Sequence, residues 1–254
     1  MKIIDFLEQI CDDDPSNWRN DYRYSQIIKI LKESDIKFEE VQYNNGAAKN
    51  IYVHYGKPFV NIFGAHYDIV PNVQGALDNG ASIAELIGLA INLKEHAVDD
   101  TTIAFLDNEE FLGGFGDIDD VGSKCMAQNE LKDDYKRSII LDVCARGDVI
   151  LTREDCDIDF SGYKHDIQPM PVTDDWVINS TVGLIPKDKN GEASMNRDDR
   201  SLLLSVLPKS ELKSRDTWRM LHTSDDNMGN VNIDTLKMMT SFIINLAHET
   251  PQKS

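Results

Sequence analysis

Long apolar runs, a surplus of positive charge and paired cysteines are all missing from this sequence of 254 residues. No stretch approaches the ~20 apolar residues that a membrane-spanning helix needs, and the first residues lack the pattern of a signal peptide. The four cysteines are scattered, without a Cys-x-x-Cys pair. We therefore expect no membrane span, a cytoplasmic location with reduced thiols, and no zinc site built on cysteine.

Positive charge is scarce, because 26 lysine and arginine residues face 44 acidic ones and leave a net charge of −18. Without a basic stripe to neutralise phosphates, the chain is expected to bind neither nucleic acid nor anionic lipid. The length is that of one large α/β domain, so we expect residues 1–254 to form a single domain.

Hydrophobic periodicity predicts alternating strands and helices. Helical spacing of apolar residues marks 3–10, 24–31, 79–93, 124–131 and 236–246, the last with Asn232 as its N-cap. Apolar runs between turn residues predict strands over 51–55, 59–63, 101–106, 138–143, 149–151 and 202–207. The stretch from about 156 to 196 has no readable pattern. The alternation predicts an α/β fold with a mixed, largely parallel sheet that helices cover on both faces.

Five histidine and acidic positions stand at places where predicted strands end or helices begin: His66, Asp78, Glu110, Asp142 and His222. Taken singly, such a histidine is most often a packed side chain, and such an acid belongs to a solvated turn. Ligand sites in open α/β sheets form at the carboxyl ends of the strands. Carboxylates that converge there would repel one another strongly and need a cation.

Zinc suits this set, because histidine nitrogen and carboxylate oxygen are its usual ligands outside thiolate sites. Two zinc ions a few ångströms apart need one shared carboxylate and about two further protein ligands each. The five positions supply that number. One more acid, Glu109, is then left to act as a base.

Several short segments carry a family resemblance in their order along the chain: Ala65–Asp68, Gly75–Ser82, Asn108–Gly113, Leu141–Cys144 and His222–Asn227. In this ordered set the sequence resembles the co-catalytic dizinc aminopeptidases that include bacterial leucyl aminopeptidase. The resemblance runs from about residue 20 to the end. It implies a three-layer α/β/α sandwich of the zinc-exopeptidase (phosphorylase/hydrolase-like) type, and a substrate that is a peptide or a small amino-acid derivative.

The resemblance also implies how the ligands divide between two zinc ions. Asp78 would bridge the two ions, Glu110 and His222 would complete one of them, and His66 and Asp142 the other. The protein would then be a hydrolase that removes the N-terminal residue of a peptide.

Two further acids receive roles from the same resemblance. Asp68 would hold the His66 ring through its second nitrogen, as metal-bound histidines generally require. Glu109 would be the general base, which takes a proton from the attacking water and passes it to the leaving amine. The peptide bond before Asn79 is expected to be cis, as in this family.

Animal-type glutaminyl cyclases resemble the same pattern and give the alternative function. They use one zinc ion, here at Asp78, Glu110 and His222, and form N-terminal pyroglutamate. The segment His222–Asn227 and an insertion after Glu110 favour the cyclase, whereas Phe115 and Leu221 stand where cyclases have tryptophan. In that case Asp199 would join an acidic network, although a solvated loop is the simpler interpretation of this residue. A non-catalytic binding module is a second alternative, but it predicts a lost ligand or base, and all six positions are filled.

Overall fold

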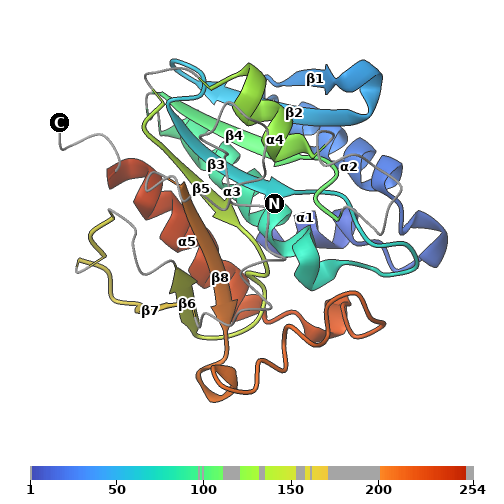
Figure 1. The fold of residues 1–254 in the computed structure, drawn as a ribbon, viewed down its shortest axis with the longest axis vertical. Coiled ribbons are helices and arrows are strands. Elements are labelled where there is room, and N and C mark those ends of the chain that lie inside the picture. The colour runs from blue at the N-terminus through green and yellow to red at the C-terminus, as the bar shows by residue number, and fades with distance from the viewer. Residues whose placement is uncertain are drawn as a thin grey trace.

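The computed structural model describes residues 2–96, 98, 100–110, 121–131, 135–152, 158–160, 162–170 and 201–249. Strands from these residues form one sheet in the order β1-β2-β4-β3-β5-β8-β6-β7 (Figure 1). Their bounds are β1 (Glu39–Tyr43), β2 (Ala48–Tyr55), β3 (Asn61–His66), β4 (Thr101–Leu106), β5 (Arg137–Leu141), β6 (Val149–Thr152), β7 (Asp166–Pro169) and β8 (Ser201–Leu207).

The centre of the sheet is parallel. Strand β3 pairs in parallel with β4 on one side and with β5 on the other, and β5 pairs in parallel with β8. Strand β2 runs antiparallel to both β1 and β4, and β6 runs antiparallel to β8. The carboxyl ends of β4, β3 and β5 therefore lie side by side at one edge of the sheet, where ligand sites form in such folds.

Helices cover both faces of the sheet, so the fold is the predicted α/β/α sandwich (Figure 1). Alternate residues of β4 show the two sides. Ile103 and Phe105 belong to the larger core, whereas Ala104 and Leu106 pack in a second core with Met126 of α4. The larger core contains side chains of the other four helices: α1 (Ile3–Ile10), α2 (Asn20–Glu33), α3 (Ala81–Glu95) and α5 (Ile233–Glu249), with α4 (Gly122–Asn129) on the opposite face.

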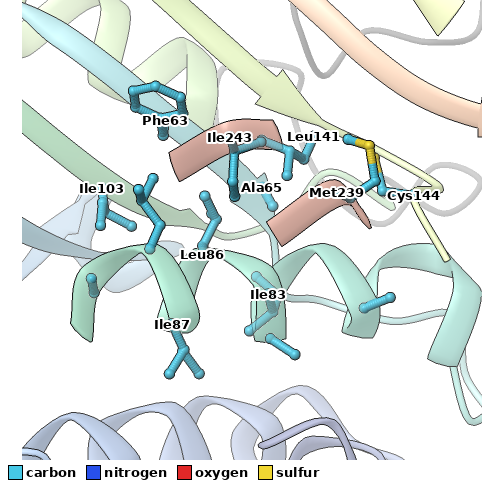
Figure 2. Close-up of a cluster of buried hydrophobic side chains, with 14 of the residues drawn as sticks. Phe63, Ala65, Ile83, Leu86, Ile87, Ile103, Leu141, Cys144, Met239 and Ile243 are labelled. Carbon is cyan, nitrogen blue, oxygen red and sulfur yellow. The ribbon is translucent and has the colours of Figure 1, made fainter. Parts of the chain in front are cut away.

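The larger core fixes α3 against the parallel strands. Figure 2 shows Leu86 of α3 pointing toward the strands that carry Phe63 and Ile103, whereas Ile87 points from the opposite side of the helix. All four side chains are fully buried. Because the apolar face of α3 is held in this way, the segment that enters the helix is placed next to the carboxyl ends of β3 and β5.

Most predicted elements are confirmed, and the exceptions have physical reasons. Strand β1 and strand β7 were missed because they lie at the edges of the sheet and carry polar residues such as Glu39, Glu40 and Asp166. The N-cap prediction is confirmed, since the Asn232 Oδ1 atom accepts a hydrogen bond from the Asp234 amide at 2.8 Å. Among the described residues, no helix combines the length and apolar character that crossing a membrane requires.

Candidate metal centre

Three of the candidate ligands come from the ends of adjacent parallel strands. His66 is the last residue of β3, and Asp142 directly follows β5. Glu110 lies four residues after the end of β4, whose Leu106 is paired with His66. The sheet register therefore brings these side chains to one edge, as the sequence predicts.

Asp78 reaches the same edge from the segment Ala76–Gly80, which leads into α3. The side-chain amide of Asn79 donates to the Leu141 carbonyl at 2.8 Å and ties this segment to the end of β5. The Asp78–Asn79 peptide bond is cis, as expected. Gly75 has φ +64, and a Cβ atom there would lie 2.8 Å from the Asp78 carbonyl, so this turn requires glycine.

The two carboxylate oxygens of Asp78 face different partners. Its Oδ1 atom lies 3.0 Å from His66 Nε2, which is 3.7 Å from Asp142 Oδ1. Its Oδ2 atom lies 3.4 Å from His222 Nε2, which is 3.0 Å from Glu110 Oε2. One carboxylate thus joins two groups of ligand atoms.

Both groups fit a metal ion. In each of them the potential ligand atoms lie within 4.8 Å of one another. Ligands on a tetrahedral zinc ion with bonds of about 2.1 Å are separated by about 3.4 Å, so small shifts suffice. Within the described part of the chain, the buried Glu110 Oε1 and Asp142 Oδ1 atoms have no hydrogen-bond partner. Buried carboxylate oxygens without a donor are what an ion at this place would satisfy.

The charges of the site show why a cation is needed. Burial and the neighbouring Asp78 raise the pKa of Glu110 to about 7, against the opposing effect of His222. Hydrogen bonds with Asp78 and Glu110 raise the pKa of His222 to about 10. Burial alone would lower the pKa of His66, but Glu109 and the other surrounding carboxylates raise it well above its usual value. The site holds a surplus of negative charge, which protons or a metal ion must balance.

Asp68 has a contact that the sequence did not reveal. Its Oδ1 atom lies 3.4 Å from His66 Nδ1. Its two short hydrogen bonds are instead accepted from the backbone amides of Glu109 and Glu110, at 2.9 and 2.8 Å. Asp68 therefore fixes the turn that carries both glutamates, and its role in holding the His66 ring stays a prediction.

Glu109 lies at the centre of the acidic group, with its Oε2 atom 3.9 Å from His66 Nε2. Burial raises the pKa of this carboxyl well above its usual range. A carboxyl group with a raised pKa can take up a proton near neutral pH, which is the property that a general base of this kind needs.

Comparison with known proteins connects this geometry to a family. The sequence pattern that defines Peptidase family M28 matches residues 50–247. This chain belongs to peptidase family M28. Membership of a peptidase family supports hydrolase chemistry, and the groups of possible ligands described above fit a metal ion. The comparison with curated protein sequences gives no match.

Solved structures show the fold of this M28 chain in other proteins. The Legionella pneumophila LapA aminopeptidase matches with a TM-score of 0.68 and 12% identity, over 99% of this chain and 71% of LapA. A Zn-dependent exopeptidase from Parabacteroides distasonis gives 0.64 and 17%, over 98% of each chain. A glutaminyl cyclase from Bacteroides thetaiotaomicron gives 0.63 and 17%, over 99% of this chain and 98% of the cyclase. The predicted fold is confirmed, and the fold is shared by both activities.

The structure brings all five candidate ligands of this M28 chain together, and it adds one acid that the sequence reasoning missed. Asp226 is buried and accepts hydrogen bonds from the amides of Leu77 and Asp78, at 2.7 and 3.4 Å. The sequence feature that could have identified Asp226 is its place in the His222–Asn227 segment. The roles given to the ligands stay predictions, and Phe115 and Asp199, which bear on the cyclase alternative, lie outside the described residues.

Proposed function

We propose that this M28 chain is a zinc aminopeptidase that removes the N-terminal residue of peptides or of small amino-acid derivatives, with two zinc ions. The observation that carries the proposal is the placement of Asp78, whose two carboxylate oxygens face two separate ligand groups. His66 and Asp142 would complete one zinc site, and Glu110 and His222 the other. A shared carboxylate with two flanking ligand sets is what a pair of close metal ions requires.

Zinc bound there supplies a Lewis acid that activates water and stabilises negative charge on the carbonyl oxygen. The chain's own residues do the proton transfer. Glu109 takes the proton of the attacking water on its carboxylate and gives it to the nitrogen of the leaving amine. Asp68 holds the Glu109 amide at 2.9 Å and so keeps the base in place during both transfers. The raised pKa of Glu109 supports this role.

A glutaminyl cyclase is the second candidate function. It is favoured by the likeness to the B. thetaiotaomicron cyclase, which extends over 99% of this chain and 98% of that one. The segment His222–Asn227 supports it as well. In that case Asp78, Glu110 and His222 would hold one zinc ion, and His66 and Asp142 would hold none.

Metal analysis and substrate tests on the same preparation separate the two functions. The aminopeptidase predicts two zinc ions per chain and hydrolysis of aminoacyl-arylamides. The cyclase predicts one zinc ion and the formation of pyroglutamate from glutaminyl peptides. One zinc ion with pyroglutamate formation and no arylamide hydrolysis would refute the proposal.

A further inference from the structure

Residues 67–80, between β3 and α3, carry Asp68 and Asp78 and rest on the N-terminal part of the chain. Arg23 of α2 is 1% exposed, and its guanidinium donates to backbone carbonyls of this segment. The acceptors are Tyr67 at 3.3 Å and both Gln74 and Gly75 at 2.9 Å. Within the described part of the chain, no carboxylate forms an ion pair with it. Its other acceptor is the sulfur of Cys11, at 3.7 Å. A buried cation that is held by neutral acceptors is a costly arrangement, and it needs a reason.

The same segment is held from its other end by a buried anion. Asp226 is also 1% exposed, and it accepts hydrogen bonds from the amides of Leu77 and Asp78. The carbonyls of residues 74 and 75 therefore bond to a positive charge, and the amides of residues 77 and 78 bond to a negative one. Each charge meets the backbone dipole of opposite sign. Burial and the neighbouring Asp78 raise the pKa of Asp226 to about 7, and the two amides and the Arg23 guanidinium oppose that rise.

Gln74 joins the same arrangement to both ends of the chain. Its side-chain amide donates to the Cys11 carbonyl at 3.0 Å, and its side-chain oxygen accepts from the Met228 amide at 2.8 Å. The family pattern begins at residue 50, so Arg23 and Cys11 come from a part of the chain that this pattern does not include. The position of the segment is thus set by residues that lie outside the family pattern as well as inside it.

We propose that Arg23 and Asp226 are positioning residues, which together hold Asp78 so that its two oxygens reach both ligand groups. The proposal rests on Asp78 being a metal ligand, as in the proposed function. Displacement of the segment would move Asp78 away from His66 and His222, which lie only 3.0 and 3.4 Å from its oxygens. Loss of either charge is therefore expected to weaken zinc binding while the core stays folded.

The test is zinc affinity, measured by competition with a chromophoric chelator and without any assay of activity. Arg23→Met removes the donors and keeps the apolar stem, and we expect zinc to bind about 10- to 100-fold more weakly, as when partners of metal ligands are lost. Arg23→Lys keeps the charge and should recover part of the affinity. Ile27→Val, on the same helix and fully buried, is the matched control for lost packing, and its zinc affinity should equal that of the wild type.

A second pair of variants tests the coupling. Asp226→Asn keeps an acceptor for the two amides but removes the charge, and it should also weaken zinc binding. If the two residues act as one clamp, the double variant should lose less affinity than the sum of the single losses, in free energy. Circular dichroism establishes that each variant is folded, and Asp226→Asn carries the test if Arg23→Met does not fold.

The outcomes separate this proposal from the proposed function. Wild-type zinc affinity in folded Arg23→Met or folded Asp226→Asn would overturn the clamp. A wild-type protein with one zinc ion and cyclase activity would overturn the aminopeptidase and leave the clamp intact, because Asp78 binds metal in both cases. A wild-type protein that binds no zinc would overturn both.

Discussion

Replacement of Glu85 by glutamine should stabilise the protein increasingly as the pH rises. Glu85 lies on α3 with its side chain fully buried. Within the described part of the chain, neither of its carboxylate oxygens has a hydrogen-bond partner. Burial raises the pKa of this group well above its usual value, so it stays protonated in the folded protein.

The sign and the size of the effect follow from proton linkage. Below about pH 4.3, the carboxyl is protonated in the folded and unfolded chains alike, and its stability contribution does not change with pH. Above that value the unfolded chain loses the proton while the folded chain keeps it, so the free energy of unfolding falls by up to about 1.4 kcal/mol per pH unit. Between about pH 5 and pH 7 the free energy of unfolding of the wild type should therefore fall by up to about 2.7 kcal/mol, and that of Glu85→Gln should not show this fall.

Urea unfolding of both proteins from pH 5 to pH 7 gives the required comparison. The other titrating groups are common to the two chains, so the difference in free energy of unfolding isolates Glu85. Glu8→Gln, at an exposed position on α1, is the matched control and should show no such trend. A difference that stays constant across this range would mean that Glu85 is ionised in the folded protein, and the reasoning from burial would be wrong.

Three further variants test the metal centre. Glu109→Gln should keep its zinc and lower kcat by about 10²- to 10⁴-fold, the usual contribution of a general base; substantial residual activity with full zinc content would exclude that role. Asp142→Ala should reduce the zinc content from two ions to one, as measured by metal analysis. If the wild-type protein holds only one ion, and the variant keeps that ion, the result would support the cyclase. Asp68→Ala should weaken zinc binding by about 10- to 100-fold, because the turn that carries Glu109 and Glu110 loses its acceptor; unchanged affinity in calorimetry would contradict this.

The sequence predicted the fold class and the meeting of the five ligands because both follow from short-range patterns. Apolar runs mark the buried strands, and a polar residue after each run marks its carboxyl end, as at His66 and Asp142. Strands β1 and β7 escaped because edge strands are not buried on both faces and lack the apolar run that identifies the others.

The contacts that support the ligands could not be predicted in the same way. Asp226 meets Leu77 across 149 positions of sequence, and Arg23 meets Gly75 across 52. Neither has a periodic pattern or a typical metal-ligand spacing to identify it. Asp68 was predicted to act on a histidine ring two residues away, but its short bonds go to the backbone of a different strand's end. Such partners become visible only when the chain is folded.

If Asp226 holds Asp78 in place, as we propose, the metal centre can form only after the segment with Asp226 has been synthesised. Asp226 and His222 lie late in the chain, whereas Asp78 and His66 are made early. A chain growing on the ribosome can therefore form the parallel strands before it can hold a metal ion, since domains acquire their structure as synthesis proceeds from the N-terminus. Zinc binding would then report that the segment with His222 and Asp226 has reached the site, and a chain without this segment would lack a complete metal centre.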